Sequence, residues 1–264
     1  FFSFDETVTT PYEYWINLKY NPGLFSTFGE GKGYLVAYQV SGTKSFTGKL
    51  NTQDIALTGL TNTTGSSYPG WHLVGNPFAS AINWVTGSWT KTNIDAIAQV
   101  WDASTSSYKT MAEKGNIIPA MNGFMVHTTG NGTLKIPGNA RVHNAASWYK
   151  SVEEEPYILL KANDLTGNTS QSSIIRFSPM ATEGYDPLYD SYFLAGFAPM
   201  FYSATGNNYL ALNTLPELTG ELTIPLGFIK NASSAFSIEL GESIPGTQVL
   251  LEDIQANALH NLSE

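Results

Sequence analysis

The sequence predicts an all-β protein, and three observations support this prediction. Short runs of β-branched and aromatic residues recur along the chain, and Gly, Pro, Asn or Asp lies close to each run. Gly (24) and Pro (13) are plentiful among the 264 residues, which suits short strands joined by tight turns. The length allows two domains of ordinary size. We therefore expect two tandem β-sandwich domains of the jelly-roll or immunoglobulin-like kind.

The predicted strands are short runs whose composition fits a pleated, half-buried surface. They are residues 34–40, 71–74, 123–127, 157–162, 173–177, 209–212, 236–240 and 248–252. Only residues 93–99 and 253–262 allow a helical turn or two. Almost all of the predicted secondary structure is therefore strand.

An internal repeat marks the first half of the chain. The sequence Gly-Tyr-Leu-Val at residues 33–36 aligns without a gap with Gly-Phe-Met-Val at residues 123–126, and Gly48 aligns with Gly138. A strand, a Gly-containing turn, a returning strand and a closing Gly account for this spacing. We therefore predict equivalent β-hairpins at residues 33–48 and 123–138. The alternative is chance similarity between two hairpins, because only a few residue types are common in turns.

A charge run closed by a proline, Glu153-Glu154-Glu155-Pro156, predicts a linker near residues 145–156. The expected domains are residues 1–147, which contain both predicted hairpins, and residues 148–264, which form a second β-sandwich.

Composition excludes several classes of partner and site. The net charge of −9 makes nucleic acid an unexpected partner, because binding its backbone needs clustered Lys and Arg. No run of 18 apolar residues is present, so no membrane-spanning segment is predicted. Cysteine is absent, which excludes disulfides, thiolate metal sites and Cys nucleophiles.

No catalytic motif emerges from the sequence. There is no Gly-x-Ser-x-Gly elbow, and the four histidines are widely separated, with no His-Glu-x-x-His spacing. A glycoside hydrolase would need two facing carboxylates, and the sequence does not pair the candidates Asp54, Asp95, Asp102 and Glu113. We therefore predict no catalytic residue and no enzyme activity.

The densest acidic group outside the linker is Glu183, Asp186 and Asp190. A hard cation such as calcium could use these oxygens, but no calcium-loop pattern of alternating acidic residues is present. Turn capping is the preferred interpretation, and no cofactor is predicted.

Aromatic residues next to amide and acidic side chains suggest a glycan-binding site. Sugar rings stack their apolar C–H faces on flat aromatic rings, while polar side chains bond the hydroxyl groups. The candidate residues are Asn83, Trp84, Trp89, Trp101 and Asp102. The alternative for each Trp is core packing, because Trp is highly buried on average.

Several motifs resemble a region common near the C-terminus of large surface proteins of Bacteroidetes-type bacteria. In the first half they are residues 31–36 (GKGYLV), 46–51 (FTGKLN), 70–78 (GWHLVGNPF) and 82–84 (INW). In the second half they are residues 181–186 (ATEGYD), 189–190 (YD), 212–216 (LNTLP), 224–227 (IPLG) and 251–253 (LED). Together they cover nearly the whole chain.

The resemblance implies a secreted protein or one on the outer face of the outer membrane. Such regions often precede a sorting domain of the type IX secretion system. In the family the pattern after residues 251–253 continues into another aromatic strand, so we expect the second sandwich to be truncated at its C-terminus. The partners implied are neighbouring domains of a longer parent protein.

The leading functional hypothesis is a non-catalytic structural or adhesion module of this secreted or surface protein. A carbohydrate-binding module that contacts surface glycans through exposed aromatic residues is the alternative. A glycoside hydrolase domain is the third and least favoured hypothesis.

Overall fold

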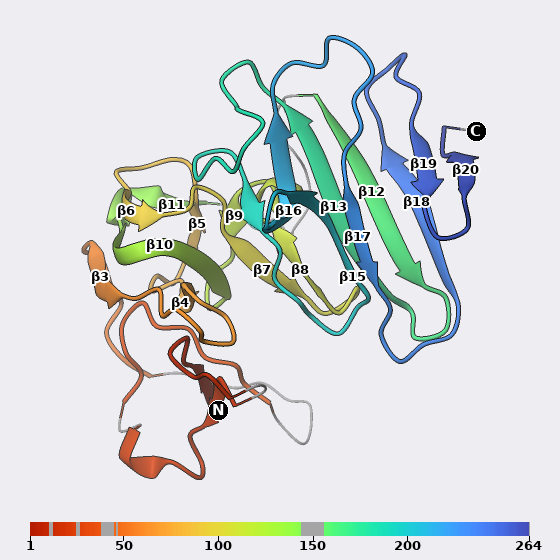
Figure 1. Ribbon diagram of the computed structural model, residues 1–264. Helices are drawn as coiled ribbons and strands as arrows, with labels where there is room; N and C mark the ends of the chain where they lie inside the picture. Colours follow the sequence, from red (N-terminus) through yellow and green to blue (C-terminus); the bar gives the residue numbers. More distant parts are fainter. Residues whose placement is uncertain (11–12, 25–26, 38–44, 46, 144–155, 264) are drawn as a thin grey trace. The chain divides into compact units, whose positions relative to one another are not determined.

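The computed structural model describes residues 1–10, 13–24, 27–37, 45, 47–143 and 156–263 (Figure 1). Strands make up 44% of it and helix 4%, which confirms the all-β prediction. The helical turns are η1 (Pro22–Leu24), η2 (Ala112–Lys114) and η3 (Gly138–Ala140). Within the described residues, none of these turns has the length or apolar character needed to cross a bilayer.

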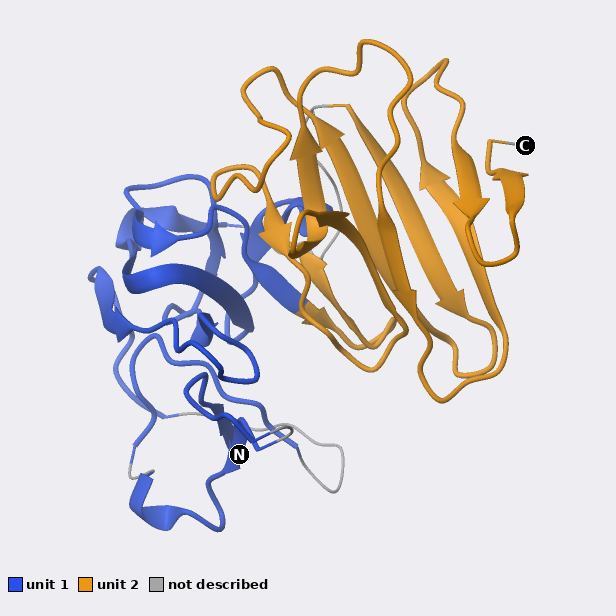
Figure 2. Ribbon diagram, viewed as in Figure 1, with its two compact units in different colours: residues 1–100, 111–150 blue, residues 101–110, 151–264 orange. Residues whose placement is uncertain are grey.

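The chain divides into two compact units (Figure 2). The first comprises Phe1–Val100 and Met111–Lys150, and the second comprises Trp101–Thr110 and Ser151–Glu264. The domain bounds 1–147 and 148–264 stay a prediction, as does the sandwich subtype. The predicted bounds place the segment Trp101–Thr110 in the first domain, whereas in the structure it belongs to the second unit.

The first unit contains strands of three sheets, and apart from the 14-residue β10 these strands are six residues long or shorter. They are β1 (Phe2–Phe4), β2 (Trp15–Asn17), β3 (Ile55–Leu60), β4 (Trp71–Gly75), β5 (Ala81–Asn83), β6 (Thr90–Ile94), the start of β7 (Gln99–Asp102), β9 (Ile117–Ile118), β10 (Gly123–Ile136) and β11 (Arg141–Val142). Strand β10 pairs with β3, β4, β6 and β7, whereas β11, β5 and β9 form a separate sheet, and β1 pairs with β2. Strand β10 is therefore the organising strand of this unit.

Strand β10 corrects the predicted hairpin at residues 123–138. Its first part pairs with β4, its second part pairs with β3 and β6, and the register shifts between Thr128 and Thr133. The Thr128 hydroxyl oxygen lies 2.7 Å from the Asn93 carbonyl oxygen and 2.6 Å from that of Gly130, so its single hydrogen bonds to one of these two acceptors and helps to fix an irregularity in place of a turn. The chain continues in one strand because new partners satisfy its main-chain groups beyond this point.

The other predicted hairpin, residues 33–48, lies largely outside the described residues. Its described start contains one isolated bridge, between Leu35 and Phe2, and no regular strand. The predicted strand at residues 34–40 is therefore not formed in the part that the structure describes.

The core of the first unit surrounds the fully buried Trp84. Val74, Phe124 and Val126 reach it from β4 and β10, and Trp84 meets Phe124 edge to face at 5.6 Å. Burying large aromatic and aliphatic side chains is the main stabilising contribution in such a core.

The second unit is built on a seven-stranded sheet. The strands of the unit are β8 (Ser107–Thr110), β12 (Tyr157–Asp164), β13 (Thr169–Phe177), β14 (Ser191–Tyr192), β15 (Met200–Thr205), β16 (Asn208–Leu215), β17 (Leu226–Ile229), β18 (Phe236–Glu242), β19 (Leu250–Asp253) and β20 (Ala258–Asn261). Strands β12 to β18 form the seven-stranded sheet, whereas β8 pairs with β7. The sheet order is β17-β15-β16-β13-β12-β18, with β14 beside β16. Strands β13 and β16 are parallel, while β19 and β20 form a separate hairpin.

Burial alternates along β12, as expected for a strand with one face on a core. Ile158, Leu160 and Ala162 pack on that face with Ile175 and Phe177 of β13. The predicted strands at residues 157–162, 173–177, 209–212 and 236–240 are all found. This sheet is therefore the part of the fold that periodicity and composition predict best.

Neither of the two segments that allow a helical turn forms one. Residues 93–99 contain the end of β6 and the start of β7, and residues 253–262 contain the β19–β20 turn. At that turn the Asp253 carboxylate accepts the N–H groups of Gln255 and Ala256, both at 2.9 Å, so a capped turn replaces a helix.

A buried carboxylate anchors the turn between β12 and β13. Asp164 Oδ1 accepts the N–H groups of Thr166 (2.9 Å) and Gly167 (2.7 Å). Its Oδ2 accepts Asn231 Nδ2 (3.0 Å) and Ser233 Oγ (2.7 Å). The bond from Gly167 comes first among the contacts that hold the pKa of Asp164 well below its usual range. The carboxylate therefore ties two loops of the unit together.

Gly132→Ala tests the irregularity in β10. A Cβ there would lie 2.6 Å from Thr128 Oγ1 and 3.0 Å from Ile94 Cδ1. We expect the free energy of unfolding to fall by about 1–3 kcal/mol in chemical denaturation, because overpacking a filled position costs that much. Gly130→Ala is the matched control, since the nearest atom to its Cβ would be 3.8 Å away. An equal loss in both variants would contradict this reading of the strand.

Candidate functional site

The five residues predicted to bind a glycan do not all belong to one unit. Asn83, Trp84 and Trp89 lie in the first unit, whereas Trp101 and Asp102 lie in the second. Each group is therefore considered with its own unit.

Trp84 is fully buried, so the prediction that it contacts a sugar is wrong. Its indole N–H donates to the Ala96 carbonyl, and its ring meets Trp89 edge to face at 4.8 Å. Asn83 is also engaged, because its Oδ1 accepts the N–H groups of Val85 (2.9 Å) and Thr86 (3.0 Å). The sequence pattern here marks a core residue beside a capped turn.

Lys91 of β6 covers the Trp84 ring. Its Nζ lies 3.5 Å from the ring centroid and 5.5 Å from that of Trp89, and it donates to the Trp84 carbonyl at 3.0 Å. The Trp89 indole N–H donates to the carbonyl groups of Asn83 (3.0 Å) and Thr86 (2.9 Å). The protein's own cation therefore fills the aromatic face that a sugar would need.

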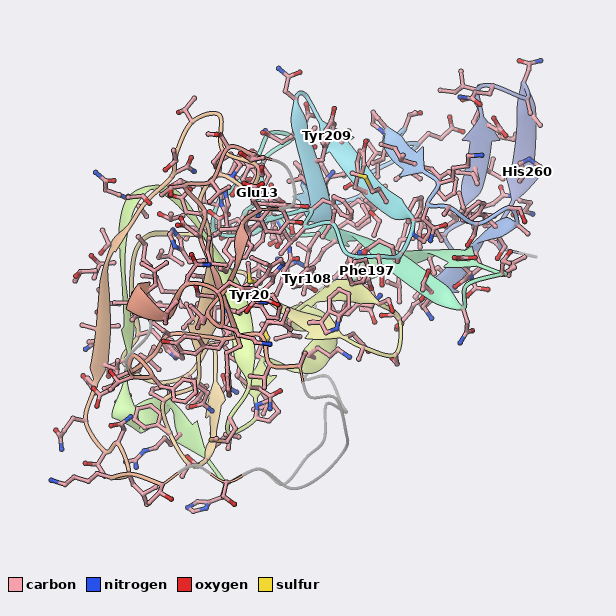
Figure 3. The ribbon with its side chains drawn as sticks, turned by 90° about the horizontal axis from the view of Figure 1, so that it is seen from below. Glu13, Tyr20, Tyr108, Phe197, Tyr209 and His260 are labelled. Carbon is pink, nitrogen blue, oxygen red and sulfur yellow. The ribbon has the colours of Figure 1, made fainter. Side chains whose placement is uncertain are left out.

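Trp101 keeps the exposure that a binding residue needs. It is 39% exposed, and its ring meets Tyr108 of β8 edge to face at 5.2 Å and Phe197 at 5.7 Å. Tyr108 and Phe197 are labelled in the side-chain view (Figure 3). Phe197 is 78% exposed. We call Trp101, Tyr108 and Phe197 the aromatic cluster.

Asp102 lies next to this cluster in sequence and caps the following turn. Its Oδ1 accepts Ser104 N (2.9 Å) and Ser104 Oγ (2.6 Å). Tyr108 and Phe197 were missed by sequence reasoning. Phe197 lies far from Trp101 along the chain, and only tertiary structure brings the two together.

The acidic group proposed for calcium serves to cap turns. Asp190 is buried, and its carboxylate accepts the N–H groups of Asp186 and Thr214, both at 2.7 Å. Burial raises the pKa of Asp190 to about 6. Asp186 in turn accepts Thr182 N at 2.6 Å, while Glu183 is exposed. Across the described part of the chain, no group of three or more His, Asp or Glu side chains could hold a metal ion.

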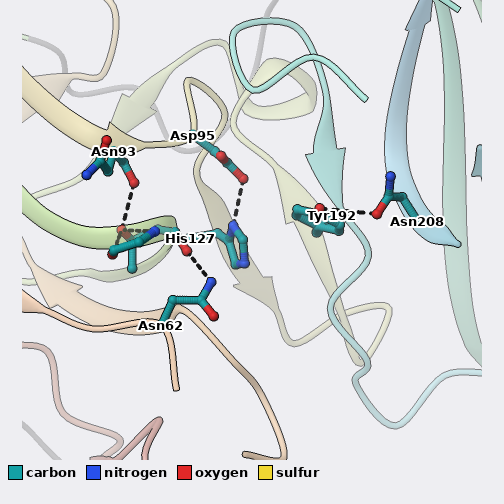
Figure 4. Close-up of polar contacts among 8 residues, drawn as sticks. Asn62, Asn93, Asp95, His127, Tyr192 and Asn208 are labelled. Atoms are coloured by element: carbon teal, nitrogen blue, oxygen red, sulfur yellow. Dashed lines mark hydrogen bonds and ion pairs between the residues drawn. The ribbon is translucent and has the colours of Figure 1, made fainter. Parts of the chain in front are cut away.

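A buried Asp–His pair lies in the first unit and was not predicted. His127 Nδ1 donates to Asp95 Oδ2 at 2.8 Å (Figure 4). Such a pair resembles the orienting half of a catalytic triad. However, Trp71 packs against the imidazole at 5.2 Å, and a Cβ on Gly70 would lie 2.9 Å from its Nε2. Backbone and ring therefore occupy the place where a substrate would have to sit.

Glu6 joins the N-terminal segment to the same region. Its carboxylate accepts the hydroxyl groups of Thr61 and Thr63 and the N–H groups of Thr63 (3.2 Å) and Gly70 (3.4 Å). Burial raises the pKa of Glu6, but these bonds outweigh it, so the pKa lies below its ordinary value. His72 Nε2 donates to the Thr61 carbonyl at 2.8 Å. The buried ionisable groups here stabilise the fold.

No protein-family model, curated protein or solved structure matches this chain.

The stability of the first unit is expected to fall in acid through His72. Burial lowers the pKa of His72, aided by nearby His127 and opposed by the Thr61 carbonyl, Glu6 and Asp5. The unfolded chain then takes up the proton more readily than the folded chain does. The contribution of His72 to the free energy of unfolding is therefore complete above about pH 6.5 and is lost as the pH falls below it.

His72→Gln keeps a donor for the Thr61 carbonyl and removes the titration. We expect the free energy of unfolding to drop less steeply between pH 7 and 5 in this variant than in the parent protein. His143→Gln, at an exposed position, is the control and should follow the parent. Parallel curves for His72→Gln and the parent would rule out His72 as the acid-sensitive group.

Lys91 should give the same trend, a stability that rises with pH, but in the alkaline range. Burial lowers the pKa of Lys91 to about 7, although the ring face of Trp84 favours the charged form. Because the unfolded chain binds the proton more tightly, the free energy of unfolding should rise from pH 7 to 10, by at most about 1.4 kcal/mol per pH unit. Denaturation of Lys91→Met should lack this rise, and exposed Lys49→Met should retain it. A rise preserved in Lys91→Met would refute this assignment.

Proposed function

We propose that this chain is a non-catalytic structural and adhesion module of a secreted or surface-exposed bacterial protein. The observation that carries the proposal is the aromatic cluster of the second unit. Phe197 and Trp101 are exposed there, and exposed aromatic groups of this kind often mark interaction sites. The resemblance to surface proteins of Bacteroidetes-type bacteria supports export through type IX secretion, with neighbouring domains of a longer parent as partners.

The use of the acidic groups supports a non-catalytic role. Glu6, Asp164 and Asp190 each accept two or more hydrogen bonds from loops. Asp54 accepts Gly138 N at 2.9 Å and lies 3.2 Å from Lys135 Nζ. Carboxylates engaged in this way stabilise turns and are poorly placed to transfer protons to a substrate.

Binding of the purified chain to immobilised collagen, fibrinogen and whole bacterial cells tests adhesion. We expect saturable binding to at least one of these surfaces, reduced tenfold or more in the double variant Trp101→Ala/Phe197→Ala. Phe228→Ala, a substitution of another exposed aromatic residue of the second unit, should leave binding unchanged. Absence of binding to every surface, glycans included, would refute adhesion.

An assay with chromogenic glycosides and esters tests the non-catalytic part of the proposal. We expect no turnover above buffer. Turnover that disappears in Asp95→Asn would instead assign a catalytic role to the Asp95–His127 pair.

Carbohydrate binding is a second candidate function. It is favoured by Trp101 and Asp102, the two members of the predicted glycan-binding set that belong to the second unit, of which Trp101 is the more exposed.

A further inference from the structure

Phe197 is an exposed ring held by an ordered backbone. The N–H groups of Phe197 and Ala198 both donate to the Ser106 carbonyl, at 3.0 and 3.1 Å. Asn231 Nδ2 donates to the Phe197 carbonyl at 3.2 Å. Hydrogen bonds from two other segments of the unit therefore fix the backbone that carries this exposed ring.

The backbone around Phe197 carries local constraints that serve this arrangement. Ser106, whose carbonyl receives both bonds, has a φ of 54°, in the left-handed region that non-glycine residues seldom adopt. A Cβ on Gly196 would lie 2.7 Å from the Ser106 carbonyl oxygen and 2.9 Å from Trp101 Cζ3. Only glycine lets the loop approach the hairpin this closely, and strained conformations of this kind concentrate at functional sites.

Trp101 differs from the other tryptophans of the predicted set in the hydrogen bonding of its indole N–H. Trp84 and Trp89 both donate to main-chain carbonyl groups. Within the described residues, no hydrogen bond uses the Trp101 N–H, and the ring planes of Trp101 and Phe197 stand at 86° to each other. The cluster therefore offers two perpendicular ring surfaces and a donor at its edge.

The charge around the cluster is low. Residues 103–107 are Ala-Ser-Thr-Ser-Ser, and residues 193–199 are Phe-Leu-Ala-Gly-Phe-Ala-Pro. Asp102 already accepts two bonds from Ser104, and Lys109 Nζ donates to Ser172. A neutral ligand with an apolar face and hydroxyl groups at its rim fits this chemistry better than an anionic or cationic one.

We infer that Trp101 and Phe197, with Tyr108 packed against Trp101, bind a neutral pyranose unit of a polysaccharide. The C–H face of the sugar stacks on the Phe197 ring, which is the more exposed, and one hydroxyl at the rim of the sugar accepts the N–H of the perpendicular Trp101 ring. Preorganised rings lose little freedom on binding, which is why the loop is fixed in advance. This inference deepens the proposed function, on which it rests, by making the adhesion one to carbohydrate.

A glycan array, followed by calorimetry of the purified chain with soluble neutral polysaccharides such as mannan, xylan and β-glucan, tests the inference. We expect binding to at least one neutral glycan. Phe197→Ala and Trp101→Ala should each weaken it tenfold or more, and Trp101→Phe, which keeps a ring and loses the N–H, should weaken it by a smaller factor. Phe197→Ala should fold normally because most of its ring is exposed. Phe228→Ala is the matched control and should bind like the parent.

The other outcomes separate this inference from the proposed function. Collagen, fibrinogen or cell binding that depends on Trp101 and Phe197, with no glycan signal, would overturn the carbohydrate assignment and leave adhesion standing. Glycan binding unchanged in Phe197→Ala and Trp101→Ala would overturn the site. Preference for a proline-rich peptide over every glycan would overturn the ligand class. No binding to any probe would overturn both.

Discussion

Buried carboxylates that accept main-chain N–H groups hold the loops of both units in place. A chain of short strands leaves many N–H groups in turns, and each one that is buried needs an acceptor. An ionised carboxylate offers more acceptor positions than any other side chain. Asp164 and Asp190 meet this need in the second unit, and Glu6 meets it in the first. These three carboxylates therefore serve to hold the loops in place.

The fold class and most strands of the second unit could be predicted because they depend on local composition and a two-residue period. The single strand found in place of the hairpin at residues 123–138 could not be predicted, since a pair of glycines is equally typical of a turn and of a strand irregularity. Whether the chain turns or continues as one strand depends on which other strands pair with it. Here β3 and β6, from distant parts of the sequence, pair with β10. Asn93, with a φ of 54°, lies one residue before the end of β6, and periodicity does not reveal this backbone conformation.

The candidate site could be predicted only in part, for a related reason. Sequence identifies which residues are tryptophan and which polar residues follow them, but burial depends on what packs from elsewhere. Lys91 covers Trp84, whereas Tyr108 and Phe197 pack against Trp101. Of the three predicted tryptophans, Trp101 is the one that has an exposed ring and whose indole N–H does not donate to a main-chain carbonyl group. The identity of Phe197 as its neighbour carries no local signal at all.

The parallel pairing of β13 with β16 has a kinetic consequence. Parallel neighbours need a long crossover, and here the crossover, residues 178–207, carries β14, β15 and the Phe197 loop. The loop also needs the segment Trp101–Thr110, which precedes the whole sheet in the chain. Closing such long loops is the slow part of folding, because their entropy must be lost before distant contacts form. We therefore expect the aromatic cluster to form late, so that its presence would distinguish a fully folded second unit from one in which only β12 and β13 have paired.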